Sequence, residues 1–233
     1  MRISRLKIRN FRGIKNTELL IPSHAVFVGD NNVGKSTVLE AIDLVLGPER
    51  LSRRPVIDEH DFYAGCYIDA NNESISVQIE AVVSDLNPEQ EKHFKDHIEW
   101  WDDELKELLD GPSPEKTDGS EVSAALRVGF NGYYDPEEDD FVGSTTFLSP
   151  VDDQGNYASF KSSDKRLFGF LYLRTLRTGS RALSLERGSL LDIILRLQDD
   201  MSLKIWEEVL QELRGLSVAE NADLGISGIL QKV

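Results

Sequence analysis

Cysteine is almost absent: the 233 residues include one, Cys66. A single thiol cannot form an internal disulfide, and it leaves a zinc site without a second thiolate ligand. This scarcity is typical of proteins in a reducing compartment. We therefore expect a cytoplasmic protein in which Cys66 is a buried structural thiol.

Long hydrophobic runs are missing as well. No stretch approaches the roughly 20 apolar residues that a membrane-spanning helix needs. Residues 1–5 lead into polar, alternating sequence and not into the apolar core of a signal peptide. The sequence therefore predicts a soluble chain with no membrane partner.

Basic charge is in deficit, because 26 Lys and Arg face 41 Asp and Glu and the net charge is −15. This excludes a generally basic protein that coats nucleic acid, although a local basic strip in an acidic molecule can still contact DNA. Hydrophobic residues make up 40% of the chain, which is enough for a sizeable core. We expect a globular fold.

The hydrophobic pattern predicts short strands around residues 6–8, 19–21 and 25–28. It then changes to helical spacing at Val38, Ile42 and Val45, and Gly47 with Pro48 ends that helix. A strand that leads directly into a helix is typical of α/β folds.

Further along, the pattern alternates between strands and helices. Strands are predicted over 74–83, 122–130, 141–148 and 168–173, and those at 122–130 and 141–148 are predicted to form a hairpin. Residues 49–72 are predicted to be a loop anchored by Phe62 and Tyr63, and residues 111–121 a surface linker. Helices are predicted over 87–110, from the apolar stripe Phe94, Ile98, Trp101, Leu105 and Leu109, and from residue 190 onward.

Residues 29–36, G-D-N-N-V-G-K-S, match the phosphate-loop pattern G-x-x-x-x-G-K-[ST] between a predicted strand and a predicted helix. Its glycines let backbone N–H groups point inward, and the helix N-terminus adds partial positive charge toward a phosphate. Lys35 is expected to neutralise the β and γ phosphates, and the Ser36 hydroxyl is expected to bind Mg²⁺. The predicted ATP-binding residues of this loop are Gly29, Asn31, Asn32, Val33, Gly34, Lys35, Ser36 and Thr37.

The phosphate loop alone does not name the class of enzyme. A GTPase also needs an N-K-x-D motif, which the chain lacks, and the D-x-x-G at residues 152–155 is expected to be a turn. A kinase that transfers a phosphoryl group from the same loop stays open as an alternative.

Three segments around the loop carry a family resemblance. Residues 8–13, I-R-N-F-R-G, then the phosphate loop, then residues 39–42, L-E-A-I, resemble the ABC-type ATPases of genome maintenance, which include RecF, the SMC proteins and the OLD (overcoming lysogenization defect) nucleases. Residues 57–63, 84–86 and 171–177 resemble the first ATPase lobe of the OLD family in particular.

The resemblance implies an ABC-type ATPase lobe of α/β class over residues 1–177, with a mixed or antiparallel sheet, and a helical segment over 178–233 that begins a dimerisation insertion. It also implies ATP and Mg²⁺ as cofactors, DNA as a partner, a homodimer, a downstream TOPRIM nuclease domain, and a nucleotide contact from Arg12. The alternative for Arg12 is a plain surface arginine. The apolar stripes of residues 190–213 are expected to pack at the dimer interface or on the chain's own strands. The alternative within the superfamily is a RecF-like or SMC-like ATPase without nuclease activity.

The catalytic residues cannot be assigned from the sequence. No segment resembles the L-S-G-G signature, and no predicted strand ends in the paired acids of a Walker B element; Asp85 and the pair Asp199 and Asp200 come closest. Because OLD and RecF-like proteins place these elements beyond a long insertion, the chain resembles the N-terminal portion of a longer protein. Arg174 and Arg177 stand where the resemblance places a loop that senses the γ phosphate.

Other charged groups have simpler explanations. His93 and His97 have the spacing of a metal pair, but a solvated helix face is the preferred interpretation. Arg50, Arg53 and Arg54 are expected to pair with nearby acids such as Asp58, Glu59 and Asp61, with contact to DNA phosphates as the alternative.

Overall fold

The computed structural model describes residues 1–48, 50, 56–109, 111, 122–170 and 172. The chain divides into two units, Met1–Tyr172 and Leu173–Val233, and the description below concerns the first. The predictions for residues 112–121, for Arg53, Arg54, Arg174 and Arg177, and for residues 178–233, including Asp199 and Asp200, lie outside the described residues.

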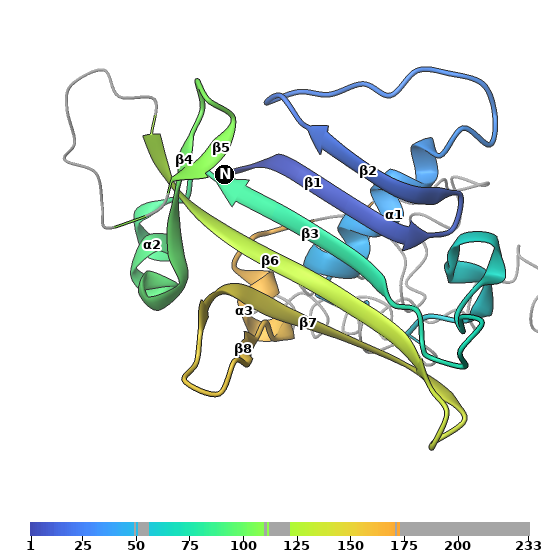
Figure 1. The fold of residues 1–233 in the computed structure, drawn as a ribbon. Coiled ribbons are helices and arrows are strands. Elements are labelled where there is room, and N and C mark those ends of the chain that lie inside the picture. The colour runs from blue at the N-terminus through green and yellow to red at the C-terminus, as the bar shows by residue number, and fades with distance from the viewer. Residues whose placement is uncertain (49, 51–55, 110, 112–121, 171, 173–233) are drawn as a thin grey trace, which may run out of the picture. The chain divides into compact units, whose positions relative to one another are not determined.

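An eight-stranded sheet forms the framework of this unit (Figure 1). Its central order is β2-β1-β3-β6-β4-β5, and β6 also pairs with β7, which pairs with β8. Every neighbouring pair among these strands is antiparallel. The strands are β1 (Arg2–Phe11), β2 (Ile14–Leu20), β3 (Val77–Ser84), β4 (Ile98–Asp102), β5 (Glu107–Leu109), β6 (Val122–Asp135), β7 (Asp140–Val151) and β8 (Tyr157–Ser159).

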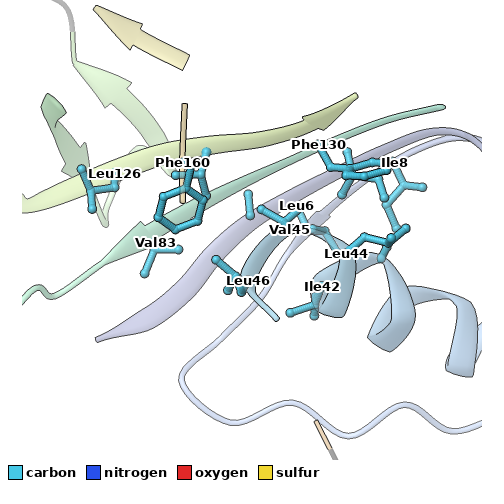
Figure 2. Close-up of a cluster of buried hydrophobic side chains, with 14 of the residues drawn as sticks. Leu6, Ile8, Ile42, Leu44, Val45, Leu46, Val83, Leu126, Phe130 and Phe160 are labelled. Carbon is cyan, nitrogen blue, oxygen red and sulfur yellow. The ribbon is translucent and has the colours of Figure 1, made fainter. Parts of the chain in front are cut away.

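One long helix, α1 (Lys35–Leu46), packs on this sheet and encloses the main core. Leu6 and Ile8 of β1 are buried toward the helix, while the intervening Lys7 is part of the opposite, charged face, where it pairs with Glu18. In Figure 2, Leu44 and Val45 of α1 lie against this strand. The predicted strands at residues 6–8, 19–21 and 74–83 and the predicted helix ending at Gly47 are thus confirmed.

The predicted hairpin is also confirmed, as β6 and β7 pair from Val128 opposite Phe147 to Asp135 opposite Asp140. Gly132 and Gly143 face each other in this ladder. A Cβ on Gly143 would lie 2.8 Å from the Phe130 ring, so the absence of a side chain there makes room for that buried ring. The hairpin therefore contributes an aromatic group to the core.

The predicted helix over 87–110 is wrong beyond its first turns. The helix α2 (Pro88–His93) is capped by Asn87 and is followed by a 3-10 turn, η4 (Lys95–His97), and then by β4 and β5. The aromatic pair at residues 100–101 favours a strand, and β4 finds a partner in β6. The apolar residues of this segment fit both the helical and the strand spacing. Pairing of β4 with β6 favours the strand.

Two predicted strands are not formed in the described residues. Residues 25–28 have no strand partner in the part of the chain that the structure describes, and Val26 and Val28 are 87% and 89% exposed. Figure 1 shows them within the long connection from β2 to α1. Residues 167–169 form a turn directly after the short helix α3 (Ser162–Arg166), so the described start of the predicted strand at 168–173 is not a strand.

The prediction of a buried Cys66 is wrong too. The segment after α1 forms two 3-10 turns, η2 (Glu59–Asp61) and η3 (Tyr63–Gly65), and Cys66 lies exposed at the end of the second. Phe62, between the turns, is the buried anchor that the sequence predicted. Among the described residues, no helix is long and apolar enough to cross a membrane.

Candidate functional site

The phosphate loop ends where α1 begins. Gly34 stands at the N-cap with φ +94°, a conformation that a residue with a side chain rarely adopts. No side chain caps this end of the described helix, and its first turn carries no acidic residue. The first N–H groups of α1 therefore remain available to an anion, and the helix dipole favours one there.

Lys35 folds back over the loop. Its Nζ donates hydrogen bonds to the carbonyl oxygens of Gly29, at 2.7 Å, and of Asp30, at 2.6 Å. Both acceptors are backbone carbonyls and not carboxylates, and the two bonds link the start of α1 to the first residues of the loop. This arrangement holds a cation at the start of a helix, which suits the binding of a phosphate group.

A pocket of about 620 Å³ opens at this point, within the size range of pockets that hold small ligands. It brings together seven of the eight predicted residues of the loop: Asn31, Asn32, Val33, Gly34, Lys35, Ser36 and Thr37. The eighth, Gly29, instead offers its carbonyl to Lys35. That these residues bind nucleotide stays a prediction, and the donor set of N–H groups, hydroxyls and one ammonium fits a phosphate chain with Mg²⁺.

Gly13 also lines the pocket, although it is not among the site residues predicted from the sequence. The signal that could have found it is the N-F-R-G segment, whose last residue it is. This glycine lies in the turn between β1 and β2, and a Cβ on it would meet no atom within 4 Å. The turn therefore forms one wall of the pocket with room for a ligand beside it.

Arg12, which the resemblance assigns to nucleotide binding, does not line this pocket. Its Nε donates a hydrogen bond of 2.8 Å to Oδ1 of Asp61, and its Nη1 pairs with Glu40. Burial lowers the pKa of Arg12, but the hydrogen bonds and charges of Asp61 and Glu40 outweigh burial and raise the pKa above its ordinary value. Direct contact of Arg12 with ATP stays a prediction.

The remaining candidates are held in ordinary structural contacts. Asp85 accepts a hydrogen bond from Arg2, and His93 lies 3.2 Å from Asp164. His97 stacks on Phe147 with ring centroids 3.9 Å apart. Over the described residues, no group of three or more His, Cys, Asp or Glu side chains is arranged to hold a metal ion.

Ser36 allows a direct check on the metal. In Ser36→Ala, we expect ATP binding without Mg²⁺ to stay at the wild-type level, while the gain in affinity on adding Mg²⁺ becomes smaller because a hydroxyl ligand is lost. Isothermal titration with ATP in EDTA and in Mg²⁺ measures both. Ser23→Ala, a change at an exposed serine before the loop, is the control. An unchanged Mg²⁺ dependence would exclude Ser36 as a ligand.

Known ATPase and nuclease sequences are similar to this chain. The family model described as AAA ATPase domain matches residues 1–119. The OLD nuclease of Thermus scotoductus is 27% identical over 227 residues, which cover 91% of this chain and 35% of that protein. The uncharacterized protein YbjD of Escherichia coli is 41% identical over 49 residues, which cover 21% of this chain and 9% of that protein. The chain thus spans about a third or less of the length of these relatives.

One similar solved structure is described as "Structural biochemistry of ATP-driven dimerization and DNA stimulated activation of SMC ATPases". The superposition covers 88% of this chain and 98% of that chain, with a TM-score of 0.40 and 14% sequence identity. The resemblance to the OLD family is confirmed by the similarity that runs along nearly the whole chain. With its phosphate loop at the start of α1 and the family model matching residues 1–119, the chain belongs to the AAA ATPase domain family.

Proposed function

We propose that this chain binds ATP with Mg²⁺ in the phosphate-loop pocket and forms the ATP-binding part of an ATP-dependent DNA endonuclease. The observation that carries the proposal is the pocket itself, which joins Lys35, Ser36 and the uncapped start of α1. The similarity to the Thermus OLD nuclease along 91% of the chain supports the second half.

In this proposal the nuclease chemistry lies outside the chain. The Thermus relative is named a nuclease, and this chain corresponds to 35% of its length. We propose that a TOPRIM nuclease domain outside this chain cuts DNA. ATP binding at the phosphate loop gates the cut, and the protein works as a cytoplasmic homodimer. The gating would act through the loop and α1, because these are the elements that a bound nucleotide contacts first.

The test measures ATP binding and ATP hydrolysis separately. We expect the chain to bind ATP but to release phosphate very slowly, because its sequence shows neither the L-S-G-G signature nor the paired acids of a Walker B element. Titration calorimetry with ATP and a continuous phosphate-release assay on the same preparation measure the two quantities. Lys35→Ala serves as the control for both.

Three outcomes would contradict the proposal. No ATP binding by the wild-type chain would remove the nucleotide site. Rapid phosphate release would mean that this chain holds its own catalytic acids, and Asp85, Asp199 and Asp200 would be the first residues to replace. Phosphate transferred to a small acceptor instead of water would favour the kinase alternative.

A further inference from the structure

Three sequence segments that are far apart in the chain meet at one cluster of charged side chains. Arg12 comes from N-F-R-G, Glu40 from L-E-A-I, and Asp61 from the acidic segment after α1. Both carboxylates pair with the Arg12 guanidinium. We call these three residues the Arg12 triad.

Hydrogen bonds hold the backbone around the triad. Arg12 has φ +49°, and its N–H donates to the carbonyl of Asp61 at 2.9 Å, so main chain and side chain bind the same residue. Asp61 is 4% exposed, and its second oxygen accepts the N–H of Asp58 at 3.2 Å. Phe11 and Phe62 form an isolated antiparallel β-bridge beside them. The buried end of the triad is therefore a rigid anchor.

The triad adjoins the nucleotide pocket without lining it. Gly13, the next residue after Arg12, is a wall of the pocket. The Ile14 side chain lies 3.9 Å from the place a Cβ would take on Gly34. Glu40 is on α1, in the turn that follows the phosphate loop. Arg12 thus joins the β1–β2 turn and α1 to one buried carboxylate, beside the phosphate loop.

We propose that Arg12 is a positioning residue for nucleotide binding, which joins α1 and the β1–β2 turn to Asp61 and so holds the phosphate loop in its binding shape. The inference rests on the proposed function of the loop as an ATP site. It differs from a direct contact, because Arg12 acts through Glu40 and Asp61 and not on the phosphates.

The exposure of the Arg12–Glu40 pair supports a role in position more than in stability. The side chains of Arg12 and Glu40 are 35% and 29% exposed, and a pair this close to solvent adds little to folding free energy. Their effect on the geometry of the pocket is larger, since the groups that bind a phosphate chain must be aligned before it arrives.

The two carboxylates distinguish positioning from direct contact. If Arg12 positions the loop, Glu40→Gln and Asp61→Asn each raise the Kd for ATP, by about three- to tenfold, as expected for coupled neighbours. If Arg12 binds phosphate itself, removing a competing carboxylate frees it, and the Kd stays equal or falls. A Kd that is unchanged or lower in Glu40→Gln would overturn the proposal.

A matched pair on another part of the sheet provides the control. Glu99 of β4 accepts two hydrogen bonds from Arg127 of β6, at 3.1 and 3.0 Å, and neither residue lines the pocket. Glu99→Gln should change the thermal midpoint as much as Glu40→Gln does while leaving the Kd for ATP at the wild-type value. Equal Kd changes in both variants would show a general effect of lost ion pairs and would overturn the proposal.

The surface position of Glu40 keeps the test valid if Asp61→Asn unfolds. Arg12→Lys should restore part of the affinity that Arg12→Ala loses, because the ammonium still reaches a carboxylate but lacks the two-sided fork of the guanidinium. In the double variant Arg12→Ala/Glu40→Gln, the loss should be smaller than the product of the single losses. Independent losses would contradict the triad. Loss of ATP binding by the wild-type chain itself would instead reject the proposed function, and this inference with it.

Discussion

Lys35→Ala is expected to weaken ATP binding by at least about 100-fold, which corresponds to about 3 kcal/mol. An ammonium that faces two phosphates makes charge-assisted hydrogen bonds of about 1.5–3 kcal/mol each, and alanine makes none. In the free protein the same ammonium binds the carbonyls of Gly29 and Asp30, so binding exchanges these contacts for stronger, charged ones.

Titration calorimetry with ATP and Mg²⁺ measures the loss. Lys15→Ala removes an exposed lysine of β2 and provides the control for the change in net charge. A Kd for Lys35→Ala equal to that of Lys15→Ala would exclude the phosphate loop as the ATP site. Far-ultraviolet circular dichroism on both variants separates lost binding from lost folding.

Lys165→Met is expected to stabilise the fold, by about 2 kcal/mol at pH 7. Lys165 is fully buried, and in the described structure its Nζ has no hydrogen-bond partner. Burial lowers the pKa of Lys165 from 10.5 to about 8, and the negative charge of Asp43 offsets part of that effect. Methionine fills a similar volume without a charge to desolvate, although the attraction to Asp43 is lost with the ammonium.

The pH dependence gives a second measurement of the same group. Since the pKa of Lys165 in the folded chain, about 8, is below its ordinary 10.5, the unfolded chain binds more protons between these values. The destabilisation is complete below about pH 8 and decreases as the pH rises toward 10.5, so wild type approaches Lys165→Met in that window. Urea unfolding at pH 7 and pH 9.5 tests this, with the exposed Lys161→Met as control. A destabilised Lys165→Met at pH 7 would contradict the prediction.

The local features of the site could be predicted from the sequence because they depend on neighbours in the chain. The phosphate loop and the start of α1 follow from one contiguous sequence motif, and the end of α1 at Gly47 follows from the Gly-Pro pair that stops a helix. The β6–β7 hairpin likewise follows from alternation on both sides of an acidic turn.

The features that were missed depend on distant partners. Residues 98–109 fit both a helix and strands, and pairing of β4 with β6 chose strands. The Arg12 triad joins positions 49 residues apart, from Arg12 to Asp61, and no periodicity relates them. The sequence predicts that Arg50, Arg53 and Arg54 pair with nearby acids, and Asp61 is one of these acids. In the structure Asp61 pairs with Arg12, which is distant in the chain.

The exposed segment at residues 25–28 has a mechanical consequence for the phosphate loop. In the described part of the chain, α1 supports the loop at one end, while the apolar residues at its other end have no strand beside them. The first residues of the loop are therefore held by the two hydrogen bonds from Lys35 to Gly29 and Asp30, and not by a neighbouring strand among the described residues. Strand pairing at Val26 and Val28 would add a further support, and it would tighten ATP binding by removing conformational entropy from the free loop without contacting the nucleotide.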